Sequence, residues 1–172
     1  MHRGMYIYIY HATLQADIVR CIYPLPRRRV FVFGGITMAD KKLTPREQAF
    51  IVVFEKSFNP DMTVDEIVAS AGEVETVKIS EKAASLCREI ESNLDGIDSV
   101  IESHLRGWSK SRISKVALAA LRLGVYELEF APSKAPVGVI ISEAVGICRT
   151  YGSDEDKSFV NGVLGAVSRA HE

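Results

Sequence analysis

Residues 116–126 read Val116-Ala117-Leu118-Ala119-Ala120-Leu121-Arg122-Leu123-Gly124-Val125-Tyr126, and this stretch decides the fold. Arg122 is its only ionisable side chain apart from the tyrosine. Apolar residues at 113, 116, 117, 120, 121, 124 and 128 share one helical face, and positions 118, 123 and 125 are apolar as well. A helix that is apolar nearly all round is a buried one. We therefore expect a central buried helix from about Arg112 to Phe130.

Arg122 needs a partner if this helix is central. A guanidinium that is buried without a carboxylate costs several kcal/mol. We expect Glu143, on the next helix, to form a structural ion pair with Arg122, since Glu127 lies five positions away on the same helix. A direct ligand contact is the alternative role for Arg122. Tyr126 is expected to belong to the scaffold.

The rest of the chain from Thr44 onward shows clear helix starts. Thr44-Pro45-Arg46-Glu47 is a capping box with proline at the first helical position, and Thr63-Val64-Asp65-Glu66 repeats the box. Gly107 fits a left-handed position near the end of the fourth helix. We expect seven helices, beginning at about Thr44, Thr63, Ser80, Asp95, Arg112, Val137 and Ser153. The sequence thus predicts an all-α fold.

Composition agrees with a globular protein of one domain or of two small lobes that share a core. The chain has 172 residues, of which 47% are apolar and 25% are charged. Its longest apolar stretches are about a dozen residues, whereas roughly 20 are needed to cross a bilayer. The three cysteines, Cys21, Cys87 and Cys148, are widely spaced and odd in number. This spacing favours buried reduced thiols and a cytoplasmic protein over a disulfide framework or a metal site.

Residues 1–37 differ from the rest, because they show no helix caps and no helical period. They make a poor signal peptide, since polar residues such as Asp17 and Arg20 interrupt any apolar core. The stretch that follows, Met38-Ala39-Asp40-Lys41-Lys42, resembles a fresh start. We hypothesise that translation begins at Met38 and that residues 38–172 form the functional domain. N-terminal sequencing of the native protein tests this hypothesis.

The choice of start changes the net charge. Residues 1–37 contain five arginines and one aspartate, so their removal takes 21 basic and 22 acidic residues to 16 and 21, a net charge of −5. A protein of this charge is not a general nucleic-acid coat. Any RNA affinity would need a local basic patch or a partner.

The sequence contains no recognised catalytic motif. A Gly-rich phosphate loop, a paired-cysteine or His-Glu-x-x-His metal pattern and a nucleophile elbow are all missing. His104, which lies among apolar residues of the fourth expected helix, is more typical of a partly buried structural histidine than of a catalytic base. We therefore expect no enzyme activity, no cofactor and no metal.

Four motifs occur together in the second half of the chain. They are Trp108 with Arg112-Ile113, Leu121-Arg122-Leu123-Gly124-Val125-Tyr126-Glu127-Leu128, Ser142-Glu143-Ala144-Val145 and Phe159-Val160-Asn161-Gly162-Val163-Leu164. Their order and spacing resemble the bacterial NusB family of transcription antitermination factors, over about residues 44–170. The resemblance implies two small packed helical lobes without enzymatic activity. It also implies binding to the boxA element of ribosomal RNA leaders together with the ribosomal protein NusE, within the RNA polymerase elongation complex.

The chain departs from this family at the expected RNA surface. In the family, an arginine-rich cluster opens the first helix, whereas this chain offers only Lys41, Lys42 and Arg46 there. Phe54 stands where the family often has tyrosine, and Ser142 replaces the usual asparagine. These departures predict weakened RNA binding. Arg27-Arg28-Arg29 would substitute only if the extension is part of the protein.

We expect the RNA site to combine the start of the first helix with the loop that enters the last one. Lys41, Lys42 and Arg46 would contact phosphates beside exposed helix amides, and Lys157 would add a second charge. Phe159 is either a stacking surface for an unpaired base or a core residue. Asn161 is expected to be a buried polar brace at a close helix contact that Gly162 allows.

Three functions remain possible on the sequence. The first is an RNA-binding antitermination and ribosomal RNA processing factor that works with a protein partner. The second is a helical module that acts only through proteins, which the net charge of −5 favours. The third is an enzyme fragment, because a similar domain precedes the catalytic part of some ribosomal RNA cytosine methyltransferases; the end at Glu172 leaves no room for a cofactor-binding domain. We expect the first.

Overall fold

The computed structural model describes residues 32–33, 36–37, 43–72, 78–105, 107, 109–131 and 135–170. The chain divides into two compact units, residues 1–41 and 42–172. In the first unit, β1 (Val32–Phe33) and β2 (Ile36–Thr37) pair antiparallel, with Phe33 opposite Ile36. The sequence did not predict this short ribbon. Met38, Lys41 and Lys42 lie outside the described residues.

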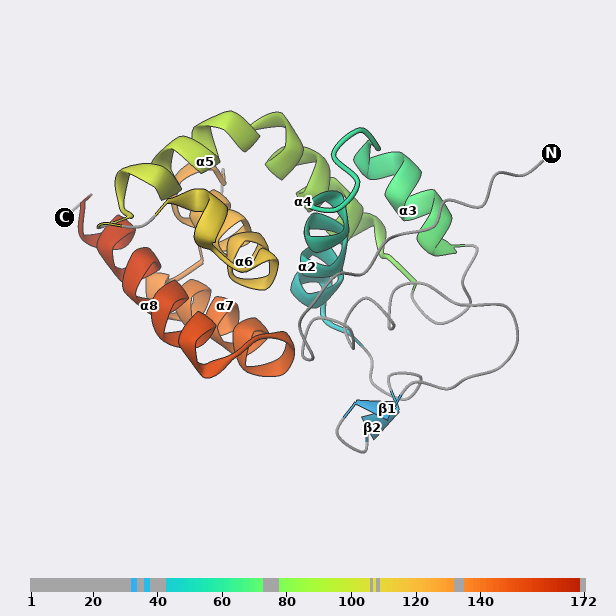
Figure 1. Cartoon of the computed structure of the whole chain (residues 1–172). Helices are drawn as coiled ribbons and strands as arrows, with labels where there is room; N and C mark the ends of the chain where they lie inside the picture. Colours follow the sequence, from blue (N-terminus) through green and yellow to red (C-terminus); the bar gives the residue numbers. More distant parts are fainter. Residues whose placement is uncertain are drawn as a thin grey trace. The chain divides into compact units, whose positions relative to one another are not determined.

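Every regular element among the described residues of the second unit is a helix, which confirms the all-α prediction (Figure 1). The described residues of this unit form seven α-helices, which are α2 (Pro45–Lys56), α3 (Val64–Gly72), α4 (Glu81–Ser92), α5 (Leu94–Ser103), α6 (Lys115–Val125), α7 (Val137–Tyr151) and α8 (Asp154–Arg169). A 3-10 turn, η2 (Lys110–Arg112), precedes α6, and a π-helical turn, η3 (Tyr126–Phe130), follows it. None of the described helices is long and apolar enough to span a bilayer.

Helix α6 is the centre of this unit, as its composition predicts. It packs against α2, α5, α7 and α8, and in Figure 1 it lies between α2 and the α7–α8 pair. Ala119, Ala120, Leu121 and Val125 of α6 are completely buried. Helices α2, α3 and α4 form one small group and α5 to α8 form another, and the contact between α2 and α6 joins the two groups. The expectation of two helical lobes with a common core is thus confirmed.

The partner of Arg122 is Asp98 of α5, so the prediction of Glu143 is wrong. Arg122 Nε and Nη2 donate to Asp98 Oδ1 and Oδ2, each over 2.8 Å. The side chains of Arg122 and Asp98 are only 12% and 14% exposed. Helix α5 packs on α6 at the level of Arg122, whereas Glu143 on α7 turns toward Arg46 of α2. Lys110 also donates to Asp98, over 3.2 Å.

Most of the expected helix starts are present, but the start of α5 differs from the prediction. The capping boxes at Thr44 and Thr63 are formed, and the Ser80 and Ser153 hydroxyls accept from the third amide of their helices. Asp95, however, does not cap α5, which begins at Leu94. Asn93 ends α4 and starts α5 at once, and its side-chain Nδ2 donates back to the Glu89 carbonyl over 2.8 Å.

The central helix begins later than expected, and the fourth helix ends earlier. Ser114 caps α6 by accepting from the Ala117 amide, so residues 110–112 form a separate 3-10 turn. Helix α5 stops at Ser103, and Gly107 follows with a left-handed φ of 74°. Gly107 therefore belongs to the connection between α5 and η2. It does not end the helix directly.

The close helix contact predicted around Gly162 lies elsewhere. Asn161 and Gly162 are exposed on α8, and a Cβ at Gly162 would meet no atom within 4 Å. The prediction of Asn161 as a buried brace is therefore wrong, because position 161 faces outward while Val160, Val163, Leu164 and Val167 face the core. The close approach is at Gly124 of α6, where a Cβ would lie 2.7 Å from Leu164 Cδ1.

The two cysteines of the described region are buried and reduced. Cys87 is 1% and Cys148 is 0% exposed, and both are free thiols. Burial raises the pKa of each thiol to about 12. Cys21 lies outside the described residues. Within those residues, no cluster of three or more His, Cys, Asp or Glu side chains is arranged to hold a metal ion.

Candidate nucleic-acid interface

The first turn of α2 carries the one predicted RNA contact of this region that the structure describes, Arg46. Thr44 is extended and its hydroxyl accepts from the Glu47 amide, while Glu47 accepts from the Thr44 amide over 2.9 Å. Pro45 occupies the first helical position, where an amide hydrogen is not needed. These three residues fix the start of the helix, and Arg46 projects from it. The positive end of the helix dipole lies at the same place.

Arg46 is held by two carboxylates. Its Nε donates to both oxygens of Glu127, over 2.8 and 3.0 Å, and its Nη1 lies 4.0 Å from Glu143 Oε2. The Glu127 side chain is 16% exposed, whereas that of Glu143 is 49% exposed. The terminal nitrogens of Arg46 donate no hydrogen bond within the described residues. Glu127 therefore binds the guanidinium at Nε. The outer edge of the guanidinium, formed by Nη1 and Nη2, remains able to bind a phosphate.

The π-helical turn η3 aims two consecutive side chains at two different helices. Glu127 contacts Arg46 of α2, and the Tyr126 hydroxyl donates to Glu89 of α4. Burial, and then the hydrogen bond to Glu89, raise the pKa of Tyr126 to about 12. Tyr126 is 3% exposed and lies in the core. The wider turn thus connects the central helix to both α2 and α4.

Gln48 joins the starts of α2 and α4. Its Oε1 accepts from the Ser80 amide over 2.9 Å and from the Ser80 hydroxyl over 2.7 Å, and its Nε2 donates to the Leu43 carbonyl over 3.2 Å. Ser80 is the residue that caps α4. The positive ends of two helices are therefore held beside each other on this face.

The other predicted RNA contacts lie at the start of α8. Ser153 and Asp156 form a capping box, and Asp156 also accepts from the Ser114 hydroxyl over 2.7 Å. Lys157 forms an ion pair with Asp154 one turn earlier, which keeps the pKa of Asp154 below its usual value. Phe159 is half-buried. The lysine charge is thus partly compensated within its own helix.

Arg46 and Lys157 lie near opposite ends of α6. Lys115, at the start of α6, donates to the Ser57 carbonyl at the end of α2 over 2.6 Å, whereas Arg46 contacts η3 beyond the end of α6. Helices α2 and α6 are therefore antiparallel. The first turn of α8 is bonded to Ser114, at the start of α6. The start of α2 and the start of α8 therefore lie near opposite ends of α6.

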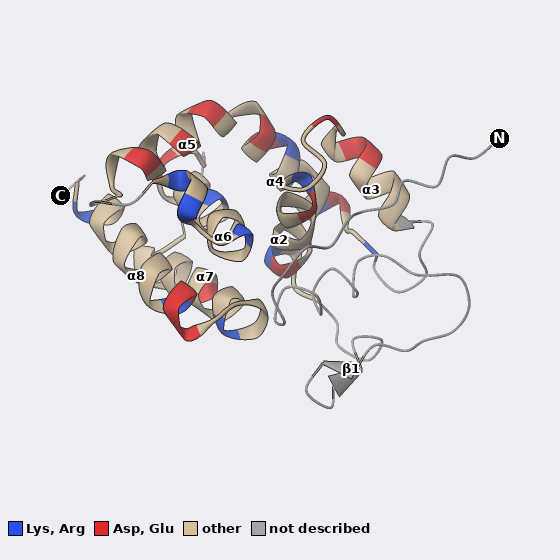
Figure 2. Cartoon of the chain, viewed as in Figure 1, with Lys and Arg blue, Asp and Glu red and all other residues tan. Residues whose placement is uncertain are grey.

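Acidic side chains dominate another part of this unit. Figure 2 shows them recurring along α3, α4 and α5. They include Asp65, Glu66, Glu81, Glu89, Glu91, Asp95 and Glu102. Such carboxylates repel a phosphate backbone except where a cation pairs with them, as Arg88 does with Asp65 and Glu81. The starts of α2 and α8 are therefore the better candidates for RNA contact.

Sequence reasoning missed the partners that position the candidate residues. Glu127 is 81 positions from Arg46, and Ser80 is 32 positions from Gln48. No local motif marks either pair. Phe54, which replaces the expected tyrosine, is fully buried, and its ring lies 5.8 Å from that of Phe50. Ser142 is exposed on α7.

Comparisons with known proteins agree with this architecture. The NusB family model matches residues 43–169. Transcription antitermination protein NusB of Lysinibacillus sphaericus is 38% identical over 124 residues, which are 72% of this chain and 94% of the relative. The corresponding protein of Aquifex aeolicus is 36% identical over 129 residues, with 73% and 86% covered.

Solved structures show the same similarity. The solution structure of NusB from Aquifex aeolicus has a TM-score of 0.64 at 35% identity, covering 74% of this chain and 86% of that one. A crystal structure of the antitermination factors NusB and NusE in complex with dsRNA matches with a TM-score of 0.63 at 32% identity, covering 73% and 94%. On the family match and these identities, the chain belongs to the NusB family.

Proposed function

We propose that this chain is a transcription antitermination factor that binds boxA-type ribosomal RNA leader sequence together with NusE. It supports the transcription and processing of ribosomal RNA as part of the RNA polymerase elongation complex, in the cytoplasm and without catalysis. The observation that carries this proposal is the family match over residues 43–169. The similar structure that contains NusB, NusE and dsRNA supports both partners.

We assign the RNA contacts to the starts of α2 and α8. Arg46 contributes the terminal nitrogens of its guanidinium, and Lys41 and Lys42, which precede α2 in the sequence, contribute two further positive charges. Lys157 and Phe159 contribute a charge and an aromatic ring from α8. Because Arg46 and Lys157 both have carboxylate partners, we expect RNA binding to be weak without NusE.

A second candidate function is a helical module that acts through proteins alone. The pairing of Arg46 with Glu127 and of Lys157 with Asp154 favours it, because compensated charges attract phosphate less strongly. The net charge of −5 for residues 38–172 points the same way.

Binding of boxA-like RNA to the full chain, measured with and without NusE across a salt series, separates the two functions. The first predicts binding that weakens as salt rises and that tightens when NusE is present. NusE binding with no contribution from RNA would favour the second function. The variant in which Arg27, Arg28 and Arg29 become serine shows whether the N-terminal arginines contribute.

A further inference from the structure

The start of α4 brings two uncompensated lysines next to the start of α2. Lys78 and Lys82 flank Ser80, the residue that Gln48 of α2 holds by two hydrogen bonds. Both lysines are exposed, and neither forms an ion pair with a residue of the described part of the chain. Arg46 lies two positions before Gln48 on α2 and faces Glu127 of η3, whereas Gln48 faces Ser80 of α4.

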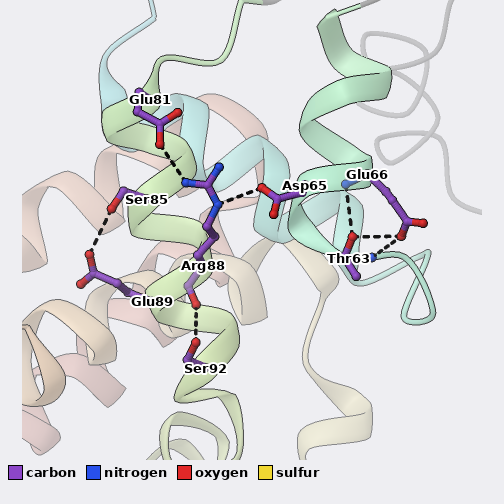
Figure 3. A network of polar contacts seen from close by, with 8 residues as sticks. All are labelled: Thr63, Asp65, Glu66, Glu81, Ser85, Arg88, Glu89 and Ser92. Atoms are coloured by element: carbon purple, nitrogen blue, oxygen red, sulfur yellow. Dashed lines mark hydrogen bonds and ion pairs between the residues drawn. The ribbon is translucent and has the colours of Figure 1, made fainter.

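The acidic neighbour of these lysines has a partner of its own. Glu81 accepts from Arg88 Nη1 over 2.8 Å, and Arg88 Nε donates to Asp65 of α3 over 2.8 Å (Figure 3). In Figure 3, Arg88 lies between the two carboxylates. Arg88 therefore compensates the negative charge of Glu81. Glu81 therefore forms its ion pair with Arg88 and not with Lys78 or Lys82.

We propose that Lys78 and Lys82 contact RNA phosphates and extend the Arg46 surface from α2 onto α4. The proposal rests on the proposed RNA-binding function and adds two residues to it. Each lysine is a point charge at the positive end of a helix, and phosphate is the ligand that this arrangement attracts. The two lysines add positive charge to the small basic cluster of Lys41, Lys42 and Arg46 around the start of α2.

Gln48 joins the two helix starts that carry these cations. It accepts two hydrogen bonds from Ser80 and donates one to the carbonyl of Leu43, directly before the α2 cap. The two helix starts are therefore fixed relative to each other before RNA arrives. Lys78 and Lys82 are therefore carried by a helix start that is fixed to the start of α2, which carries Arg46.

The test is the affinity of the full chain for boxA-like RNA in the presence of NusE, with the variants K78Q, K82Q and K78Q/K82Q. Loss of one single-strand phosphate contact lowers the salt slope by about 0.7, which at 0.1 M salt is roughly a fivefold loss of affinity. We expect about that loss for each lysine and about 25-fold for both. K78R/K82R should restore binding to within about twofold of the wild type, since it keeps both charges.

R169Q is the matched control, because it removes one exposed cation from the last turn of α8 and leaves the α2–α4 surface unchanged. It should bind RNA like the wild type. An unchanged affinity and salt slope in K78Q/K82Q, with the wild type binding RNA, would overturn the inference and leave the proposed function intact. A wild type that never binds RNA, even with NusE, would overturn the proposed function itself. A K78Q/K82Q variant that loses NusE affinity without RNA would assign the lysines to a protein interface and refute the phosphate contact.

Discussion

Arg122 and Asp98 form a two-bond ion pair between α6 and α5, with both donor–acceptor distances at 2.8 Å. This pair compensates the one charge between Val116 and Val125 of α6, a stretch that is otherwise apolar. Lys110 approaches the same carboxylate and also forms an ion pair with Glu102 over 2.6 Å. Lys110 thus links the Arg122–Asp98 pair to Glu102 on the exposed side of α5.

Removal of one partner of this pair should destabilise the fold strongly. In Asp98→Ala, the Arg122 guanidinium keeps its burial but loses its carboxylate, and such a loss costs about 3–5 kcal/mol. Urea unfolding measures the change in the free energy of unfolding. The double variant Asp98→Leu with Arg122→Met should lose less than the sum of the two single variants, because it leaves no unpaired charge. An Asp98→Ala protein with the wild-type midpoint would contradict this role.

The same carboxylate should make stability fall in acid. Burial alone would raise the pKa of Asp98, but the hydrogen bonds and charges of Arg122 and Lys110 outweigh burial and hold the pKa below its usual value of 3.8. A carboxyl whose pKa is lower in the folded state stabilises the fold above the unfolded pKa. This contribution is complete above about pH 4 and disappears as the pH falls through the folded pKa. Thermal melts between pH 6 and pH 2 should show the loss, and Asp98→Asn should show a weaker dependence on pH.

Two glycines give a matched test of helix packing. Gly124→Ala would place a Cβ 2.7 Å from Leu164 Cδ1 and 3.0 Å from its Cδ2, and Leu164 is completely buried. We expect a loss of about 1–3 kcal/mol in the free energy of unfolding from this overpacking. Gly162→Ala meets no atom and should stabilise α8 by about 0.5–1 kcal/mol. Equal effects at the two positions would show that the α6–α8 contact does not depend on Gly124.

Glu143 should weaken RNA binding by competing for Arg46. Its carboxylate lies 4.0 Å from Nη1, on the edge of the guanidinium that a phosphate would use. Two charges at such a distance interact by about 1 kcal/mol in water, so Glu143→Gln should tighten RNA binding about fivefold at low salt. Fluorescence anisotropy with labelled boxA-like RNA measures this change.

Glu102→Gln is the control for that variant. The Glu102 side chain is 53% exposed, close to the 49% of Glu143, and its partner is Lys110 of η2. Both variants raise the net charge by one. If Glu102→Gln tightens RNA binding as much as Glu143→Gln, the effect comes from net charge, and the specific competition at Arg46 is refuted.

The helices were predictable because their signals are local. The boxes at Thr44 and Thr63 each lie within four residues, and the buried face of α6 repeats over little more than a dozen. The ion-pair partners were not predictable, because several carboxylates could reach Arg122 and only the packing of α5 on α6 selects Asp98. The exposed position of Asn161 likewise depends on the rotation of α8 about its own axis, which a single polar residue does not reveal.

The candidate site was partly predictable for the same reason. Arg46 stands out at a helix start, so its location follows from the capping box. Its pairing with Glu127, and the approach of Ser80 to Gln48, arise from tertiary packing. The π-helical turn that presents Glu127 has no recognised sequence signal in this chain.

Helix α2 is fastened at both of its ends. Arg46 bonds to Glu127 at the first turn, and Lys115 bonds to the Ser57 carbonyl just beyond the last turn while its ammonium lies 4.7 Å from the centre of the Phe58 ring. A helix with tertiary contacts at only one end can pivot about that end, whereas contacts at both ends prevent such a rotation. The chain therefore presents α2 in an orientation set during folding, and a molecule that docks on this helix gives up less conformational entropy than it would on a loose one.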